Sequence, residues 1–251
     1  MSATLAGLLA DKDAESPAIG APGRPWLTYG GLRSLSLDLR RQLRRHGIAA
    51  HDRVAIVLPN GPEMAAAFVA IAQSATTAPL NPAYRQEEFA FYLEDLRANA
   101  EARGIAVLRL EGRTDGPAGS FTLSGPDQGG TEDTGEPGAG STALILHTSG
   151  TTSRPKIVPL LQSNIVASAR HIAAALALTP ADRCLNVMPL FHIHGLIAAV
   201  SASLSAGASI WCAPGFDALK FFGWMKEARP SWYTAVPTMH QAILSRAARA
   251  D

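Results

Sequence analysis

A segment of nine residues, Thr148-Ser-Gly-Thr-Thr-Ser-Arg-Pro-Lys156, combines five hydroxyl side chains with one glycine, one arginine and one lysine. Phosphate recognition needs backbone N–H groups that approach oxygen atoms closely, short hydroxyl donors and a compact cation. Gly150 permits the close approach because it has no Cβ. The segment therefore predicts a phosphate-binding loop, and a solvated serine and threonine turn is the alternative that composition leaves open.

The spacing in this segment differs from that of a Walker-type nucleotide site. That motif has a glycine directly before its lysine and a serine or threonine directly after it. Here Pro155 precedes Lys156 and Ile157 follows it. No acidic residue at a strand end is apparent either, so an unrelated ATP hydrolase is disfavoured.

Two histidines, His192 and His194, follow an apolar run that ends in proline. A histidine can donate a hydrogen bond to a carboxylate. Either histidine could instead cap backbone carbonyls and be structural. A metal pair is disfavoured because no third ligand clusters with them. His147 faces the sheet by alternation, and we expect it to be structural.

A helix is predicted near the start of the chain, from leucines spaced by three and four residues at Leu32, Leu35, Leu39 and Leu43, with Gly47 ending it. Its arginines are Arg33, Arg40, Arg41, Arg44 and Arg45. We expect them to form a solvated face, and an anionic docking patch is the alternative.

Apolar strands and helices alternate along the rest of the chain. We predict strands over 53–58, 105–110, 143–147, 156–161, 184–188, 208–212 and 232–236. We predict helices over 63–72, 87–97, 163–176, 196–205, 218–228 and 237–248. This alternation is typical of an α/β fold with largely parallel β-sheets layered with helices.

The stretch 111–140 departs from this alternation, since it holds nine of the 22 glycines, three prolines and six acidic residues. Such a composition cannot pack a core, and we expect a flexible glycine-rich and acidic linker.

The overall composition points to a globular, cytoplasmic protein. Lysine and arginine number 22 against 21 acidic residues, a net charge of +1, which argues against a nucleic-acid partner. Hydrophobic residues make up 47% of the chain, but no run has the length of a membrane span or a secretory signal. The two cysteines, Cys184 and Cys212, lie in apolar runs and are expected to be reduced and buried.

Four segments in order resemble the adenylate-forming (AMP-binding) superfamily of acyl-CoA synthetases, luciferases and peptide-synthetase adenylation domains. Residues 148–156 resemble its phosphate loop, Ser/Thr-Ser-Gly-Ser/Thr-Thr-Gly-x-Pro-Lys. The other three are Pro79-Leu-Asn-Pro82 with Tyr84, Pro189-Leu-Phe-His-Ile-His-Gly195 and Trp232-Tyr-Thr-Ala-Val-Pro-Thr-Met-His240. Ser153-Arg154, in place of Gly-x, and the histidine segment are most similar to the branch of oxalyl-CoA synthetases.

The resemblance implies an ATP-dependent acyl-CoA synthetase, an acid–thiol ligase that forms an acyl-adenylate and passes the acyl group to coenzyme A. It implies β- and γ-phosphate binding by Thr148, Ser149, Gly150, Thr151, Thr152 and Ser153, with Lys156 as the motif lysine. Thr152 would lie near Mg²⁺. His192 would be the catalytic-site residue beside the carboxylate, in a pocket lined also by His194, Gly195, Val236, Pro237 and Met239. A histidine at that position implies a small carboxylic or dicarboxylic acid rather than a fatty chain, because it can donate to a second carboxylate.

Two departures from the family pattern limit what this chain is expected to do alone. Residues 98–104 lead directly into the next strand, where the family has a further strand. The chain also ends at Asp251, before the family's C-terminal half and mobile lid domain. We therefore interpret residues 1–251 as the N-terminal portion of the domain, inactive alone. A non-catalytic binding or scaffold module that keeps the fold is the alternative.

Overall fold

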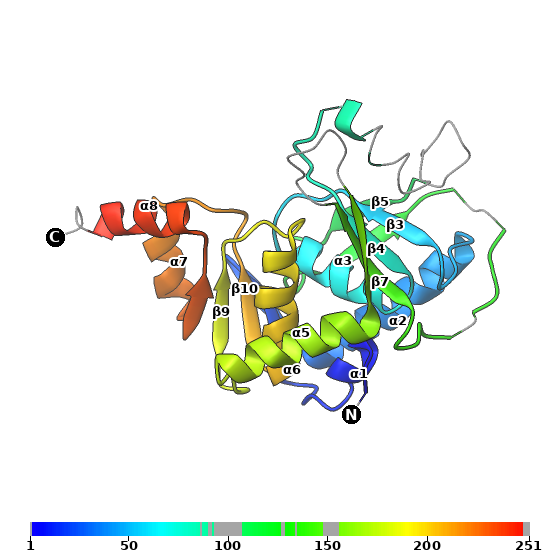
Figure 1. Cartoon of the computed structure of the whole chain (residues 1–251), viewed down its shortest axis with the longest axis horizontal. Helices are drawn as coiled ribbons and strands as arrows, with labels where there is room; N and C mark the ends of the chain where they lie inside the picture. Colours follow the sequence, from blue (N-terminus) through cyan, green and yellow to red (C-terminus); the bar gives the residue numbers. More distant parts are fainter. Residues whose placement is uncertain are drawn as a thin grey trace.

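The computed structural model describes residues 2–85, 87–89, 92, 107–126, 129–133, 135–147 and 156–247. Residues 148–155 of the predicted phosphate loop lie outside this part of the chain, as do residues 98–104 and much of the helix predicted over 87–97. The described residues form the mixed α/β fold with largely parallel sheets that the sequence predicts (Figure 1).

The larger sheet has five strands in the order β11-β9-β10-β1-β2. Their bounds are β1 Pro17–Ala21, β2 Arg24–Thr28, β9 Arg183–Asn186, β10 Ser209–Cys212 and β11 Trp232–Thr234. Strands β11, β9, β10 and β1 pair in parallel, and β2 pairs with β1 in the antiparallel direction. The carboxyl ends of four strands therefore point to one edge of this sheet.

The second sheet has four strands in the order β3-β4-β7-β8. They are β3 Arg53–Ile56, β4 Thr76–Pro79, β7 Thr142–His147 and β8 Ile157–Leu161. The first three are parallel, and β8 runs antiparallel to β7. Strands β5 (Arg109–Gly112) and β6 (Phe121–Ser124) form a separate antiparallel pair.

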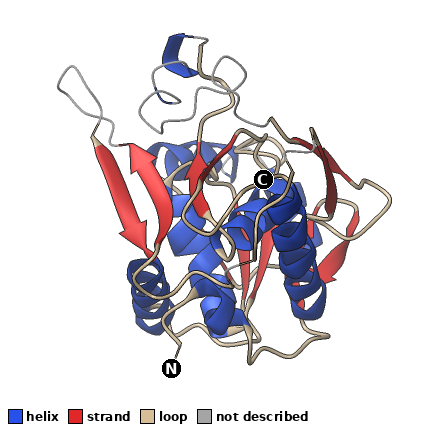
Figure 2. Cartoon of the chain, turned by 90° about the vertical axis from the view of Figure 1, so that its right-hand side faces the viewer, coloured by secondary structure: helices blue, strands red, loops and turns tan. Residues whose placement is uncertain are grey.

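Helices pack between and around the two sheets, as Figure 2 shows. Their bounds are α1 Leu5–Leu9, α2 Tyr29–Arg45, α3 Pro62–Ala72, α5 Gln162–Ala175, the π-helix η2 His194–Ser201, α6 Ala202–Ala206, α7 Phe221–Ala228 and α8 Pro237–Ala247. Helix α3 touches strands of both sheets, and every residue in it except Glu63 is buried. Its alanine-rich sequence permits this close packing on all sides, which joins the two sheets into one core.

The expectation that 111–140 packs no core is wrong for part of that stretch. Strand β6 lies within it, Phe121 joins the main hydrophobic core and Ala118 is fully buried. The Ala118 N–H donates to the carbonyl of Pro25 at 2.8 Å. Glycine and proline disfavour helices here, but they do not prevent a short hairpin whose apolar side chain reaches the core.

The arginines of α2 are only partly solvated. Arg41 is exposed, as expected, but Arg44 is 5% exposed and donates to the carbonyl of Ser74 at 3.0 Å. The Arg40 guanidinium forms two ion pairs, from Nε to Oδ2 of Asp133 at 3.2 Å and from Nη1 to Oε1 of Glu136 at 3.4 Å. Acidic residues of the stretch 111–140 therefore pair with this helix. The expectation of a solvated face fails for Arg44 because two of its acceptors, on Ser74 and Asp133, are 30 and 89 residues away in the sequence.

The predicted helix end at Gly47 is confirmed. Helix α2 ends at Arg45, and Gly47 follows with a φ of 76°, a left-handed conformation that glycine adopts without strain. The helix predicted to begin at Leu196 starts instead at His194, as the π-helix η2. None of the helices in the described residues is long and apolar enough to cross a membrane.

Candidate functional site

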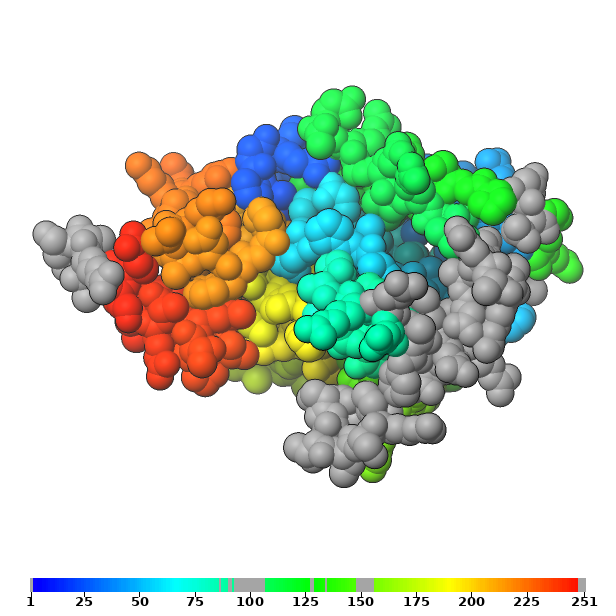
Figure 3. Space-filling model, turned by 90° about the horizontal axis from the view of Figure 1, so that it is seen from above, coloured from blue at the N-terminus to red at the C-terminus, as the bar shows by residue number. Residues whose placement is uncertain are grey.

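The carboxyl ends of the parallel strands mark the candidate site, because ligands of open α/β sheets bind outside these ends. The connections that follow β3, β9 and β11 leave from the upper side of Figure 1. Figure 3 looks down on that side, where the β3–α3 connection (cyan), the chain after β9 (yellow) and the start of α8 (red) reach the surface. Each of the predicted site segments begins at one of these strand ends.

The seven residues from Pro189 to Gly195, which we call the histidine loop, follow β9 and include the first two residues of η2. The loop is tightly folded, since the His192 N–H donates to the carbonyl of Pro189 at 3.3 Å. A Cβ on Gly195 would lie 2.6 Å from that same oxygen, so only glycine fits there. The motif glycine therefore has a steric reason in this fold.

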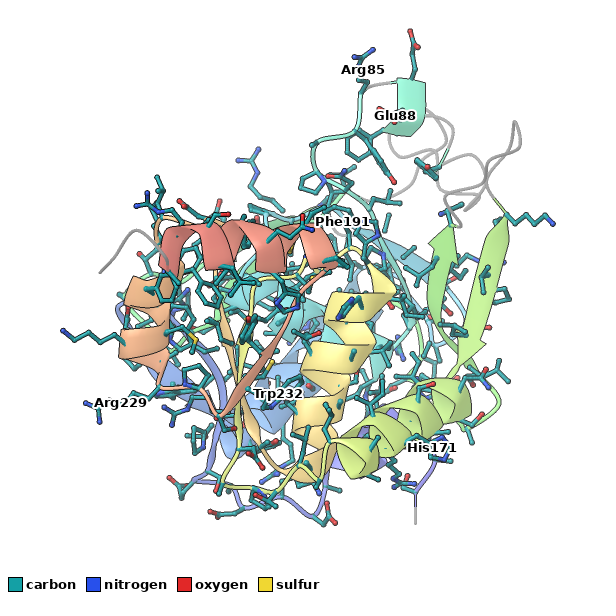
Figure 4. The ribbon with its side chains drawn as sticks, turned by 60° about the vertical axis from the view of Figure 1, so that its left-hand side comes forward. Arg85, Glu88, His171, Phe191, Arg229 and Trp232 are labelled. Carbon is teal, nitrogen blue, oxygen red and sulfur yellow. The ribbon has the colours of Figure 1, made fainter. Side chains whose placement is uncertain are left out.

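His192 is exposed at the surface of the loop, and its ring lies 4.4 Å from the ring of Phe191. Partial burial lowers the pKa of His192 below its ordinary value of 6.5, because burial disfavours the charged imidazolium. The ring is therefore neutral at pH 7, with one N–H donor and one acceptor. Figure 4 shows Phe191 near the end of the molecule that carries Arg85 and Glu88.

His194 is the first residue of η2 and is half-buried. Its Nε2 atom lies 2.7 Å from Oγ1 of Thr234, the last residue of β11, which makes a hydrogen bond between segments 40 residues apart. The sequence analysis placed His194 in the pocket but did not single out Thr234. The threonine lies in the motif Trp232–His240, but no local pattern indicates its partner.

The other predicted pocket residues follow β11 directly. Val236 connects β11 to α8, Pro237 begins α8, and the Met239 N–H donates to the carbonyl of Val236 at 2.9 Å. Val236 and Met239 are half-buried, while Pro237 is exposed. The bond between His194 and Thr234 brings this connection next to the histidine loop.

Asn60 is a second polar residue that the sequence analysis did not assign to the site. It follows β3, and its side-chain carbonyl accepts a hydrogen bond from the N–H of Leu190 at 2.8 Å. Its amide group donates to the carbonyl of Ala213 at 3.1 Å. The turn Pro59-Asn60-Gly61-Pro62 is visible in the sequence as a strand stop, but its link to the other sheet depends on tertiary structure.

Of the predicted phosphate-binding residues, the structure describes Lys156, which is exposed and precedes β8. Thr148, Ser149, Gly150, Thr151, Thr152 and Ser153 lie outside the described residues. Pairing of His147 with Ile157 holds the two ends of the predicted loop at the same edge of the sheet.

Aromatic side chains border the start of that loop. The His147 ring lies 4.6 Å from the ring of Tyr92, and Tyr92 stacks on Tyr84 at 4.7 Å with an interplanar angle of 16°. The structural role expected for His147 stays a prediction.

No group of three or more histidine, cysteine, aspartate or glutamate residues that could hold a metal ion occurs in the described part of the chain. Thr152, the residue that the resemblance placed near Mg²⁺, lies outside that part.

The fold and the sequence together define the class. Two largely parallel sheets are joined through a buried helix, with the hydroxyl-rich sequence after β7 of one sheet and the histidine loop after β9 of the other, and this is the N-terminal half of the adenylate-forming fold. The chain matches the AMP-binding enzyme family over residues 9–251 and belongs to it.

Curated relatives include the oxalate–CoA ligase of Arabidopsis thaliana, which is 42% identical over 98% of this chain and 52% of the relative. The oxalate–CoA ligase of Saccharomyces cerevisiae is 34% identical over 77% of this chain and 43% of the relative. Among solved structures, ATP-bound MatB from Rhodopseudomonas palustris has a TM-score of 0.81 at 26% identity, over 97% of this chain and 51% of that one. The chain spans about half the length of the curated relatives it matches.

Proposed function

We propose that this chain forms the N-terminal part of an ATP-dependent acyl-CoA ligase for a small carboxylic or dicarboxylic acid. The observation that carries the proposal is the position of His192 and His194 at the carboxyl end of a parallel sheet, in a chain that belongs to the AMP-binding family. Polar groups there favour an acid that is itself polar at both ends. The oxalate–CoA ligases among the relatives support the same substrate class.

The reaction has two steps. A carboxylate oxygen of the acid attacks the α-phosphorus of ATP, which forms an acyl-adenylate and releases pyrophosphate. The thiol of coenzyme A then loses its proton and attacks the acyl carbonyl carbon, which displaces AMP. Negative charge grows on the pyrophosphate during the first step, so donors fixed around it lower the barrier.

In this scheme Lys156 and the loop before it bind the departing phosphates. Lys156 supplies a positive charge next to a strand, where its backbone is held by β8. The hydroxyl and N–H donors would come from Thr148, Ser149, Gly150, Thr151, Thr152 and Ser153. These donors suit phosphate oxygens because they are short and numerous.

His192 is proposed to lie beside the acid. Its neutral ring can donate one hydrogen bond to a second carboxylate or accept one from a protonated acid. Val236, Pro237 and Met239 are proposed as the pocket wall. A fatty chain would give His192 no polar group to pair with in the pocket, which disfavours long apolar acids.

Mg²⁺ is proposed as a cofactor, with the hydroxyl oxygen of Thr152 as its protein contact. Mg²⁺ binds oxygen ligands and is held largely by substrate phosphates, so a single threonine fits its chemistry. A bound ion would neutralise charge on the leaving pyrophosphate.

The thiols of Cys184 and Cys212 are buried and form no disulfide, which supports the proposed cytoplasmic location.

ATP–pyrophosphate exchange tests the proposal. We would assay this chain alone and joined to the remaining half of the Arabidopsis relative, with oxalate, malonate, acetate, benzoate and a medium-chain fatty acid. We expect exchange from the joined protein with a small acid and little from the chain alone. Exchange with none of these acids would favour a non-catalytic module, and exchange by the chain alone at the rate of the joined protein would contradict the proposed division.

Two variants test the phosphate loop in the joined protein. Lys156→Ala and Thr152→Ala should each weaken ATP use about 100-fold, a typical loss for one donor to developing charge. Lys220→Ala is a matched control, since Lys220 is an exposed lysine 3.8 Å from Asp217. Unchanged kinetics in both loop variants would remove the phosphate-binding assignment.

A further inference from the structure

We propose that Asn60 and Thr234 are positioning residues that hold the two ends of the histidine loop and thereby set its selectivity for the acid. The selectivity part rests on the acid-binding role proposed above for this loop. Asn60 lies in the connection after β3 of one sheet and precedes the loop in the chain, whereas Thr234 is the last residue of β11 in the other sheet and follows it.

Asn60 holds the first part of the loop. Its side-chain oxygen accepts from the Leu190 N–H at 2.8 Å, and its side-chain nitrogen donates to the Ala213 carbonyl at 3.1 Å. Both functions of the amide are therefore used at once. Leu190 follows β9 and Ala213 follows β10, while Asn60 follows β3 of the second sheet, so one side chain links three strand ends.

Thr234 holds the last part of the loop. Its Oγ1 lies 2.7 Å from Nε2 of His194, and its backbone belongs to β11, where it pairs with Asn186 of β9. The threonine side chain is branched at Cβ and has few rotamers, so the hydroxyl is held rigidly by the strand. The imidazole of His194 is therefore fixed relative to the connection that carries Val236 and Met239.

The local fold of the loop explains why such anchors matter. Ile193, between the two histidines, is 50% exposed, so the core does not hold the outer part of the loop. The loop then enters a π-helix, in which the Ser201 hydroxyl donates to the carbonyl of Leu196 at 2.8 Å. Single π-turns are rare and are frequently found at functional sites. The two side-chain hydrogen bonds fix the entry to this unusual helix.

The chemical consequence concerns discrimination between acids. A polar site recognises a small acid only when its donors stay at hydrogen-bonding distance, and a displacement of about 1 Å removes much of the benefit. Loss of either anchor should therefore weaken acid binding while leaving ATP binding, which uses another loop, largely unchanged. A merely structural residue would instead lower stability and affect both substrates alike.

Nuclear magnetic resonance of this 251-residue chain tests the anchors without any activity. In Thr234→Val we expect the ¹⁵N signals of His194 to shift and broaden because the hydroxyl partner is lost, and Thr234→Ser should restore them. In Asn60→Ala the Leu190 amide should exchange at least tenfold faster with solvent, while Asn60→Asp, which keeps the acceptor, should retain protection. Thr122→Val and Asn81→Ala are matched controls in an exposed strand and in a local turn.

Kinetics of the joined protein test selectivity. We expect Thr234→Val and Asn60→Ala to raise KM for the small acid roughly tenfold with little change in KM for ATP, and Thr234→Ser to retain the wild-type KM. Circular dichroism would establish that each variant is folded, and Thr234→Ser and Asn60→Asp serve where the larger changes prevent folding.

Unchanged KM for the acid in folded Thr234→Val and Asn60→Ala would overturn the proposal. Unaltered His194 signals and Leu190 exchange would also overturn it. Failure of the proposed function has a different signature, because the wild-type joined protein would then show no acid-dependent exchange whatever the resonance data show.

Discussion

Arg24 on β2 forms an ion pair with Glu63 in the first turn of α3, and this pair joins the edge of the larger sheet to the central buried helix. The Arg24 guanidinium also donates to the carbonyls of Arg113 and Pro117, each at 2.7 Å. The side chains of Arg24 and Glu63 are 15% and 23% exposed, so solvent replaces these bonds poorly. One side chain thus holds a strand, a helix and a loop together.

Arg24→Ala should lower the free energy of unfolding by about 3 kcal/mol, because it leaves the largely buried carboxylate of Glu63 without its ion-pair partner and removes two hydrogen bonds to carbonyl groups. Urea denaturation measures the change. Arg41→Ala is the matched control, since Arg41 pairs with Asp38 at the surface with side chains 69% and 61% exposed. The control should change stability by less than about 0.5 kcal/mol. Equal effects of the two variants would contradict this role for Arg24.

Asp133 should make stability depend on acid pH. The Gly135 N–H, with further help from Arg40 and Arg44, lowers the pKa of Asp133 below its ordinary value of 3.8. The contribution of the ionised Asp133 to the free energy of unfolding is therefore complete above about pH 4 and is lost as the pH falls through the lowered folded-state pKa. The wild type should be more stable than Asp133→Asn at pH 6, and the two stabilities should converge once the pH lies below the lowered folded-state pKa of Asp133. A difference that does not shrink in acid would contradict this ion-pair interpretation.

Gly195→Ala should destabilise the protein by about 2 kcal/mol, because the new Cβ would lie 2.6 Å from the Pro189 carbonyl oxygen in a buried position. Gly223→Ala in α7 is the control, since nothing lies within 4 Å of its added Cβ. In that helix alanine should stabilise by about 0.5–1 kcal/mol. Thermal and urea unfolding measure both changes in stability, which are expected to have opposite signs. A neutral Gly195→Ala would show that the histidine loop is looser than the structure indicates.

His192 should titrate below pH 6.5, since partial burial lowers its pKa from that value. At pH values between the unfolded-state pKa of 6.5 and the lower folded-state pKa, the unfolded chain binds a proton at His192 more readily than the folded protein does. The free energy of unfolding therefore falls as the pH falls through this range. His192→Gln should therefore lose less stability than the wild type between pH 7 and pH 5. Proton nuclear magnetic resonance of the His192 imidazole at a series of pH values gives the midpoint of its titration. A midpoint at or above pH 6.5 would contradict the proposed neutral ring.

Much of the fold was predictable because local patterns determine it. The spacing of Leu32, Leu39 and Leu43 predicted α2, and these leucines are buried in the structure. The apolar runs predicted the parallel strands β3, β7, β9, β10 and β11, whereas the parallel strands β1 and β4 were not predicted. The errors occurred where glycine content or arginine content suggested solvent, at Phe121 and Arg44, because both residues find partners far away in the chain.

The candidate site, like the fold, has a part that the sequence predicts and a part that only the tertiary structure reveals. Residue types together with the family resemblance indicated a phosphate loop at Lys156 and a polar acid site at His192 and His194. The positioning residues were invisible to such reasoning. Asn60 is 130 residues from Leu190, and Thr234 is 40 residues from His194.

By itself, then, the sequence determined the alternating helices and strands, the family resemblance and the groups able to do chemistry, because these depend on residue type and short spacing. Only the tertiary structure decided which strand ends lie together, that His194 begins a π-helix against Thr234, and that Asn60 links the two sheets. The physical reason is that a hydrogen bond depends on distance in space, and packing of the two sheets on α3 sets that distance for residues far apart along the chain.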